Sequence, residues 1–470
     1  MSGSRQYTST LGTVVLSWLL LALSTACTGQ HLYRPIDSVY PVRPALPVSP
    51  TMAIVEFDDQ GFLMDGSRSQ LNKATRLLKD DERERLVLIF VHGWKHNASP
   101  EDEHLRAFSR TLMRLQRKEA VFRPDAPRPV VGIYLAWRGK STSVAPLSFL
   151  TYWGRNETAV RIGAGPAMAE TLETIIGAAR EKNEKTRVIL VGHSMGALIL
   201  QEALHSYLPR VRESPEKCKF EITAGKPIGH PIPDLTLFLN SATSSLSSVG
   251  IIDYLTRCGI TKTAGATETF TAPLFISLTS EDDDATGWLY GWARTLAFRK
   301  GGLESKTGDS PFPYSQRKYF RTTDGHNEDL MTHDLQAITT DLGRCNTVGA
   351  KADEDEFPEL RRYCLGRVTV RDANLESVPI ALPREKSPGP GPIHDWYALT
   401  RRPNARNKSL FWIVRVPHKI IASHGDIFNE RALQLSIALG DLFAATVTEL
   451  EEYKYLLDSM QAAQPPESLD

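Results

Sequence analysis

The sequence of 470 residues has no excess of charge of either sign, because 55 Lys and Arg residues balance 55 Asp and Glu residues. A protein that binds the phosphate backbone of nucleic acid needs a basic excess, so we expect no nucleic-acid partner. Internal repeats are also absent from the sequence. Hydrophobic residues make up 41% and charged residues 23% of the chain. This composition excludes a fibrous, disordered or multispanning protein and supplies enough apolar material for a sizeable core.

The apolar segment near the N-terminus is too short to span a bilayer. Arg5 precedes an apolar stretch from Leu11 to Leu23, and Ser24-Thr25-Ala26 supplies the small residues typical of a cleavage site. A transmembrane helix needs about 20 apolar residues. Residues 1–26 therefore predict a signal peptide and an exported protein.

Cys27 follows directly after this predicted signal peptide. The run LSTACTG around Cys27 resembles the lipobox of bacterial lipoproteins, in which the cysteine becomes the lipidated first residue. Ser24 stands where that pattern usually has Leu, and either simple cleavage after Ala26 or an uncleaved anchor fits the same residues. We expect a lipoprotein of the cell envelope, in the outer membrane or periplasm, attached to a membrane through Cys27. A secreted protein is the alternative.

Cysteine is scarce, with five residues in the whole chain. Four remain when Cys27 is set aside, and an even number in an exported protein indicates two disulfides. Of the three ways to pair them, we expect Cys218 with Cys258 and Cys345 with Cys364, because this pairing closes the shortest loops. Four buried free thiols are the alternative.

The rest of the chain predicts one large domain with an α/β core. Residues 27–50 are rich in proline and predict an extended tether, residues 51–460 form the domain, and residues 461–470 form a disordered tail. Short runs rich in Val, Ile and Leu alternate with amphipathic stretches, which is typical of a mostly parallel central sheet flanked by helices. The predicted strands are Leu86–Val91, Val130–Ala136, Arg187–Val191, Leu235–Leu239, Leu274–Leu278 and Phe411–Val416. The predicted helices are 102–118, 157–182, 195–208 and 427–457.

A long insertion at about 287–409 precedes the last predicted strand. It shows no strong strand pattern and ends in the loop sequence SPGPGP. Segments of this length inside a compact domain are usually functional lids or disordered. We therefore expect part of the insertion to form a lid or cap over the functional site.

The strongest functional signal is the pentapeptide GHSMG at residues 192–196. A serine hydroxyl is a poor nucleophile unless it is exposed on a rigid turn next to a base. Flanking glycines permit such a turn, and the pentapeptide directly follows the apolar run RVILV and precedes a helix-forming run. This placement predicts a nucleophile elbow with Ser194 as the nucleophile.

A second signal lies upstream, where the strand sequence LVLIFV ends in His92-Gly93-Trp94. Together with the elbow about a hundred residues later, this pattern resembles the α/β-hydrolase superfamily. The resemblance implies the α/β-hydrolase fold and an oxyanion hole made by the amide of Met195 and the loop at Gly93 and Trp94, where backbone donors stabilise a tetrahedral intermediate. We expect His92 to be a structural hydrogen-bonding residue. The alternative for this loop is a turn glycine beside a core tryptophan.

The resemblance also implies an acid and a histidine after the serine, in that order, on loops that follow later strands. The strand sequence PLFISL leads into TSEDDDAT, which is similar to an SExDxAT loop of hydrolase relatives and indicates Asp283 as the acid. His424 lies between the last strand and the terminal helix, where the superfamily has its general base. The alternatives are Asp282 and Asp284 for the acid, and His418, His326 and His333 for the base.

The segment from Asp324 to His333 also gathers groups that metals bind, including His326 and Asp329. Their spacing matches no metal motif, so we expect surface polar residues and no metal site. The predicted chemistry requires no metal or organic cofactor.

These residues predict a serine hydrolase of the esterase or lipase type. It would cleave a small-molecule or lipid ester through a Ser194–His424–Asp283 triad and an acyl-enzyme intermediate. A peptidase, a thioesterase, an acyltransferase or a non-catalytic, surface-anchored binding protein on the same scaffold remains open, because fold does not settle function.

Overall fold

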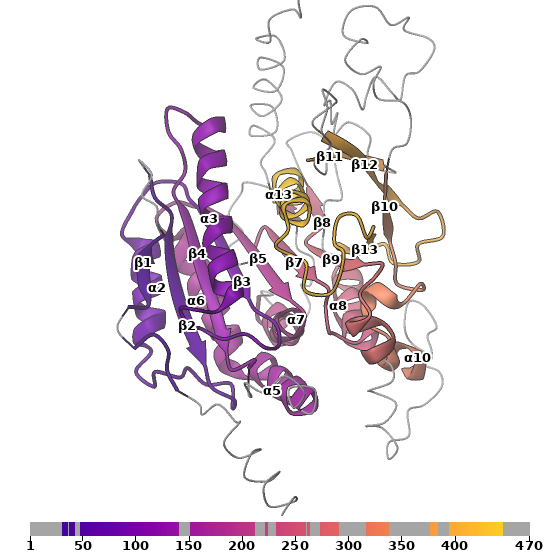
Figure 1. The fold of residues 1–470 in the computed structure, drawn as a ribbon, viewed down its shortest axis with the longest axis horizontal. Coiled ribbons are helices and arrows are strands. Elements are labelled where there is room, and N and C mark those ends of the chain that lie inside the picture. Colours follow the sequence, from indigo (N-terminus) through magenta and orange to yellow (C-terminus); the bar gives the residue numbers. More distant parts are fainter. Residues whose placement is uncertain are drawn as a thin grey trace, which may run out of the picture.

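The computed structural model describes residues 31–35, 37–42, 48–140, 151–211, 221–223, 232–259, 261–263, 273–290, 316–337, 377–383 and 394–444. Its centre is an 11-stranded sheet in the order β1-β2-β4-β3-β5-β7-β9-β13-β10-β12-β11 (Figure 1). Neighbouring strands from β2 to β10 are parallel, whereas β1, β12 and β11 pair antiparallel at the two edges. The fold is α/β with a mostly parallel central sheet, as the sequence predicts.

The central strands have continuous apolar sequences because both faces of the sheet are covered. Every residue of β3, β4, β7 and β9 is buried. All six predicted strands are present, each within two residues at either end. The central strands are β2 (Thr51–Phe57), β3 (Leu86–Val91), β4 (Val130–Trp137), β5 (Arg187–His193), β7 (Leu235–Leu239), β9 (Phe275–Ser280) and β13 (Phe411–Val416).

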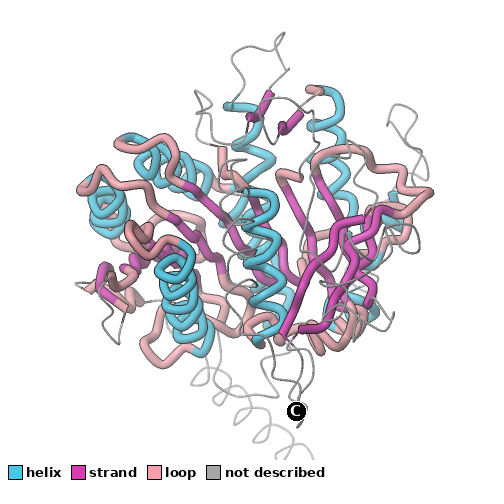
Figure 2. The backbone as a smooth tube through the Cα atoms, turned by 90° about the horizontal axis from the view of Figure 1, so that it is seen from above, coloured by secondary structure: helices cyan, strands magenta, loops and turns pink. Residues whose placement is uncertain are grey.

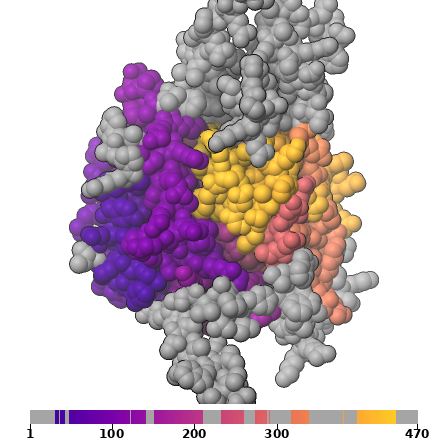
Figure 3. All heavy atoms as spheres, viewed as in Figure 1, coloured from indigo at the N-terminus to yellow at the C-terminus, as the bar shows by residue number. Residues whose placement is uncertain are grey.

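Helices cover the sheet in two layers, and each layer closes its own apolar core (Figures 1 and 2). One core lies under α3 (Glu103–Phe122) and α13 (Glu430–Ala444). Figure 3 shows the yellow C-terminal segments at the centre of this face, beside purple segments from the first half of the chain. The opposite face carries α2 (Ser69–Lys79), α5 (Tyr152–Ala164), α6 (Pro166–Glu181), α7 (Met195–Tyr207) and α8 (Ser245–Arg257).

Two helix predictions are corrected. The single helix predicted at 157–182 is two helices, because Pro166 has no amide hydrogen to donate and disfavours helical geometry at Gly165, whose ψ is 150°. The terminal helix begins at Glu430 instead of residue 427. Asn429 Oδ1 accepts a hydrogen bond from the Ala432 amide at 2.9 Å, which is the contact of an N-cap. The predicted continuation beyond residue 444 lies outside the described residues.

The described parts of the insertion include three strands that extend the sheet. They form α10 (Gln316–Arg321), β10 (His333–Ala337), β11 (Ser377–Pro383) and β12 (His394–Arg401). The expectation of no strands here is wrong, because polar and charged residues in β10 and β12 and two prolines in β11 break the apolar runs that mark central strands. The predicted lid stays a prediction, because residues 291–315, 338–376 and 384–393 of the insertion lie outside the described residues.

Part of the predicted tether also belongs to the sheet, because β1 (Val39–Pro41) pairs with β2. A separate pair of short parallel strands consists of β6 (Glu221–Thr223) and β8 (Thr261–Thr263). No helix in the ranges given above has both the length and the apolar character of a transmembrane span.

Several predictions concern residues outside the described ranges. These are the signal peptide at 1–26, lipidation of Cys27 and the tail at 461–470. Cys258, at the end of α8, is buried and disulfide-bonded. The expected pairing stays a prediction, because it also involves cysteines outside the described residues, namely Cys218, Cys345 and Cys364.

Candidate active site

Ser194 lies on the tight turn between β5 and α7. Its backbone has φ 55° and ψ −119°, a conformation that residues with a side chain rarely adopt and that concentrates at functional sites. The neighbouring glycines permit the turn. A Cβ atom on Gly196 would lie 2.1 Å from the Val91 carbonyl oxygen, and one on Gly192 would lie 2.7 Å from the Ala197 backbone. The pentapeptide therefore forms the strained strand-to-helix turn predicted from its sequence.

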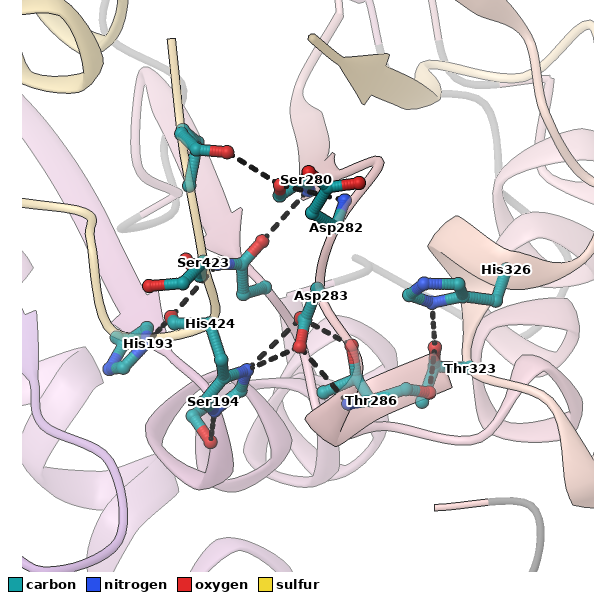
Figure 4. A network of polar contacts seen from close by, with 12 residues as sticks. His193, Ser194, Ser280, Asp282, Asp283, Thr286, Thr323, His326, Ser423 and His424 are labelled. Atoms are coloured by element: carbon teal, nitrogen blue, oxygen red, sulfur yellow. Dashed lines mark hydrogen bonds and ion pairs between the residues drawn. The ribbon is translucent and has the colours of Figure 1, made fainter. Parts of the chain in front are cut away.

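The three residues predicted as a triad lie together in one hydrogen-bonded chain (Figure 4). His424 Nε2 lies 2.7 Å from Ser194 Oγ, and His424 Nδ1 lies 2.9 and 3.0 Å from the two carboxylate oxygens of Asp283. Ser194 follows β5, Asp283 follows β9 and His424 follows β13. Because these strands are parallel, their carboxyl ends bring the three loops to one edge of the sheet.

The Asp283 carboxylate is buried and ionised. Its relative exposure is 1%, and it accepts hydrogen bonds from both the amide and the hydroxyl of Thr286. Burial raises the pKa of Asp283, but the hydrogen bonds from His424 and Thr286, together with the nearby imidazole, outweigh burial and bring the pKa below its ordinary value. The carboxylate can therefore orient the imidazole and stabilise its charged form.

Four of the five alternative acids and bases are engaged elsewhere, and the fifth, Asp284, is exposed. Asp282 and Asp284 are exposed, and Asp282 pairs with His418. His326 and His333 contact threonine hydroxyls at 3.0 and 2.8 Å. The geometry thus singles out Asp283 and His424 as the partners of Ser194.

Most of the segment from Asp324 to His333 is buried, which corrects the prediction of surface residues, although Glu328 and Asp329 reach the surface. Asp324 and His333 are 0% and 1% exposed. The 3-10 turn η4 (Asp324–His326) packs against β9 so closely that a Cβ atom on Gly325 would lie 1.9 Å from the Thr279 hydroxyl. Within the described part of the chain, no group of three or more His, Cys, Asp or Glu side chains is arranged to hold a metal ion.

The residues predicted for an oxyanion hole border Ser194. Met195 is the first residue of α7, and the first amides of a helix have no acceptor within the helix. The Gly93 backbone packs directly against Ser194. The Trp94 ring is half-buried and lies edge-on to Tyr152, with 5.4 Å between the ring centroids.

The His92 side chain supports the loop at Gly93 and Trp94 through hydrogen bonds to the backbone. Its side chain is fully buried, with Nδ1 2.9 Å from the Gly93 carbonyl oxygen and Nε2 3.1 Å from the Trp137 amide nitrogen. These partners require a neutral ring that donates from Nδ1 and accepts at Nε2. Burial lowers the pKa of His92 to about 4, so the ring is neutral near pH 7.

The fold and the site define a hydrolase-like α/β scaffold. No protein-family model and no curated protein matches the chain. Among solved structures, "RedJ with PEG molecule bound in the active site" is similar with 12% identity and a TM-score of 0.19, over 44% of this chain and 72% of that one. "Phospholipase PlaB from Legionella pneumophila in complex with thio-NAD" is similar with 13% identity and a TM-score of 0.26, over 80% of this chain and 62% of the phospholipase.

Proposed function

We propose that this protein is a serine hydrolase of the α/β-hydrolase superfamily that cleaves carboxylic esters. Ser194 is the nucleophile, His424 the general base and Asp283 the residue that orients the base. The single observation that carries the proposal is the hydrogen-bonded chain from the Asp283 carboxylate through His424 to Ser194 Oγ, which lies 2.7 Å from His424 Nε2. A hydroxyl, a base and an orienting group in this arrangement are the requirements for an activated serine.

The first step forms an acyl-enzyme. Asp283 accepts a hydrogen bond from the Nδ1–H group of His424, so Nε2 is left unprotonated. Nε2 then removes the Ser194 proton as Oγ attacks the carbonyl carbon. The resulting oxyanion would accept hydrogen bonds from the Met195 amide and from the loop at Gly93 and Trp94. His424 then returns the proton to the leaving alkoxide as the ester bond breaks.

The second step releases the acid. Water enters where the alcohol left, His424 takes its proton, and the hydroxide attacks the acyl-serine carbonyl. As the intermediate collapses, the bond between the acyl carbon and Ser194 Oγ breaks, and His424 returns its proton to Oγ, which releases the carboxylic acid and regenerates the Ser194 hydroxyl. We propose esters as substrates because an alkoxide leaves with less help from a general acid than an amine does.

A fluorophosphonate probe tests the nucleophile, because it reacts only with an activated serine. We expect the wild-type protein to be labelled and to hydrolyse p-nitrophenyl esters, and we expect Ser194→Ala to be unlabelled, with a kcat about 10⁶-fold lower. Ser436→Ala is the matched control, because the Ser436 hydroxyl bonds to the Ala432 carbonyl within α13. Equal labelling of wild type and Ser194→Ala contradicts the assignment.

A substrate panel tests the reaction class. Esters graded by acyl length separate an esterase from a lipase, and amide, thioester and alcohol-acceptor assays test for a peptidase, a thioesterase and an acyltransferase. Preferential turnover of esters supports the proposal. A folded protein that neither labels nor turns over any of these substrates would instead be a binding protein on this scaffold.

A further inference from the structure

Asn240 lies between the strands that carry the nucleophile and the acid. It directly follows β7, which is flanked in the sheet by β5 and β9. Asn240 is 0% exposed and has φ 44°, a left-handed conformation that asparagine tolerates better than most residues. Its amide donates to the Leu278 carbonyl of β9 at 2.8 Å, while the Ser194 amide donates to the preceding Leu239 carbonyl at 3.0 Å. Its backbone is therefore fixed relative to both neighbours.

The Asn240 side chain connects two loops of the site. These are the histidine loop, residues 417–429, and the acid loop, residues 281–284 together with Ser280 at the end of β9. Nδ2 donates to the carbonyl oxygens of His424 and Ser423 at 2.9 and 3.2 Å, and Oδ1 accepts from the Ser280 amide at 2.9 Å. Carbonyls only accept and a backbone amide only donates, so the partners determine which end of the side chain carries the nitrogen. A carboxylate of the same shape could not make the two contacts to carbonyl oxygens.

Ser280 adds a second connection between the same two loops. Its hydroxyl donates to the Ile421 carbonyl at 2.6 Å and accepts from the Asp282 amide at 3.1 Å. Figure 4 shows Ser280 and Asp282 on one side of this network and Ser423 and His424 on the other. The acid loop and the histidine loop are thus joined through backbone groups as well as through the triad.

His193, which directly precedes Ser194, donates a hydrogen bond to the same His424 carbonyl oxygen. Its Nε2 lies 2.9 Å from that oxygen, so Nε2 carries the hydrogen and donates it. Burial lowers the pKa of His193 to about 3, which keeps the ring neutral. Two donors, one from Asn240 and one from His193, therefore converge on the backbone of the residue that contacts Ser194 Oγ.

We propose that Asn240 is a positioning residue that, together with His193, holds the His424 imidazole in register with Ser194 and Asp283. The proposal rests on the proposed function, because it concerns the same triad. A loosened His424 loop moves the base relative to Ser194 Oγ, and a displacement of 1 Å in a reacting group costs about 100-fold in rate. Because Asn240 is 0% exposed, we expect the effect to fall on kcat and to leave KM unchanged.

Asn240→Gly is the main test, because glycine adopts positive φ without strain and removes only the side-chain contacts. We expect kcat to fall about 10-fold to 100-fold, with KM within about twofold of wild type. Asn240→Asp retains the shape but places an acceptor against two carbonyl oxygens, and we expect a loss at least as large. Titration of active sites with the fluorophosphonate probe normalises each kcat to the folded, competent fraction.

Asn407→Gly is the matched control for removal of a buried asparagine. Asn407 is 1% exposed and its Nδ2 donates to the Phe411 carbonyl at the amino end of β13, opposite the end that leads to His424. We expect this variant to lower Tm and leave kcat unchanged. A positioning role predicts that the two asparagines differ in kcat, whereas a purely structural role predicts that they differ only in Tm.

His193 supplies an independent pair of variants. His193→Phe removes the donor, whereas His193→Gln retains an amide N–H that can reach the His424 carbonyl. We expect a reduced kcat for the first and partial rescue for the second. The inference is overturned if Asn240→Gly has the same kcat as the wild-type protein. It is also overturned if His193→Phe and His193→Gln lose kcat to the same extent. Absence of labelling and turnover in the wild-type protein contradicts the proposed function instead, so the two failures are distinguishable.

Discussion

Gly93 and Ser194 are in direct contact at the edge of the sheet. A Cβ atom on Gly93 would lie 2.9 Å from the Ser194 Cβ atom and 3.0 Å from His193 Nδ1, closer than real Cβ atoms normally approach other atoms. The loop that follows β3 can therefore reach the nucleophile only with glycine at this position. This contact places the backbone proposed for the oxyanion hole beside Ser194, the proposed nucleophile.

We predict that Gly93→Ala lowers kcat about 100-fold to 1000-fold, because the added methyl group pushes the loop away and removes an oxyanion donor. Gly177→Ala, within α6, is the matched control. A Cβ atom there meets nothing within 4 Å, so we expect unchanged kcat and about 0.5–1 kcal/mol of added stability. Steady-state kinetics and thermal unfolding of both variants check the prediction, and normal kcat in Gly93→Ala contradicts it.

Asp283→Asn retains the shape of the side chain and removes its charge. We predict a kcat about 10⁴-fold lower, because the amide favours the wrong imidazole tautomer and no longer stabilises the charged ring. Asp284→Asn is the control, since Asp284 is exposed one residue away. The rate of fluorophosphonate labelling and the kcat for an ester should fall together in the first variant only. Equal effects of the two substitutions would remove Asp283 from its assigned role.

The buried carboxyl group of Asp324 should make the stability of the folded protein depend on pH, separately from catalysis. Burial raises its pKa from 3.8 to about 6, so the folded state binds this proton more tightly than the unfolded state. Its contribution to stability is present below about pH 4 and is lost as the pH rises through 6. Asp324→Asn should therefore stabilise the protein by up to about 3 kcal/mol at pH 8 and hardly at all at pH 4.

Thermal unfolding across pH 4–8 measures this difference. Asp329→Asn is the control, because Asp329 pairs with Lys318 at the surface. The Tm difference between Asp324→Asn and wild type should grow with pH, and a constant difference would show that Asp324 does not titrate in this range.

Local sequence patterns were sufficient to predict the elbow and six of the seven central strands, but β2 (Thr51–Phe57) was not predicted. Continuous apolar runs mark strands buried on both faces, and two glycines around Ser194 mark a turn that other residues cannot make. Asp283 and His424 required the order of residues in a known superfamily, since several other acids and histidines lie nearby in the sequence. The break before Pro166 was also readable from the sequence, because proline restricts the residue that precedes it.

Contacts between distant segments could not be predicted in this way. Asn240 follows a buried strand, which is a weak signal for a site residue, but its partners Ser423 and His424 lie 183 and 184 residues further along the chain. The strands of the insertion were missed for a related reason. Their pairing with β13 and with one another supplies order that their own sequences, interrupted by polar residues or proline, do not indicate.

The insertion between β9 and β13 bears on the entropy of chain closure. Asp283 and His424 are separated by 141 positions, yet they lie on loops that follow adjacent parallel strands. The entropic cost of joining two chain segments grows only with the logarithm of the length between them, so a tenfold longer connection adds about 2 kcal/mol. A change in the length of this segment therefore alters the entropy of chain closure only slightly, and the two side chains can keep the same distance.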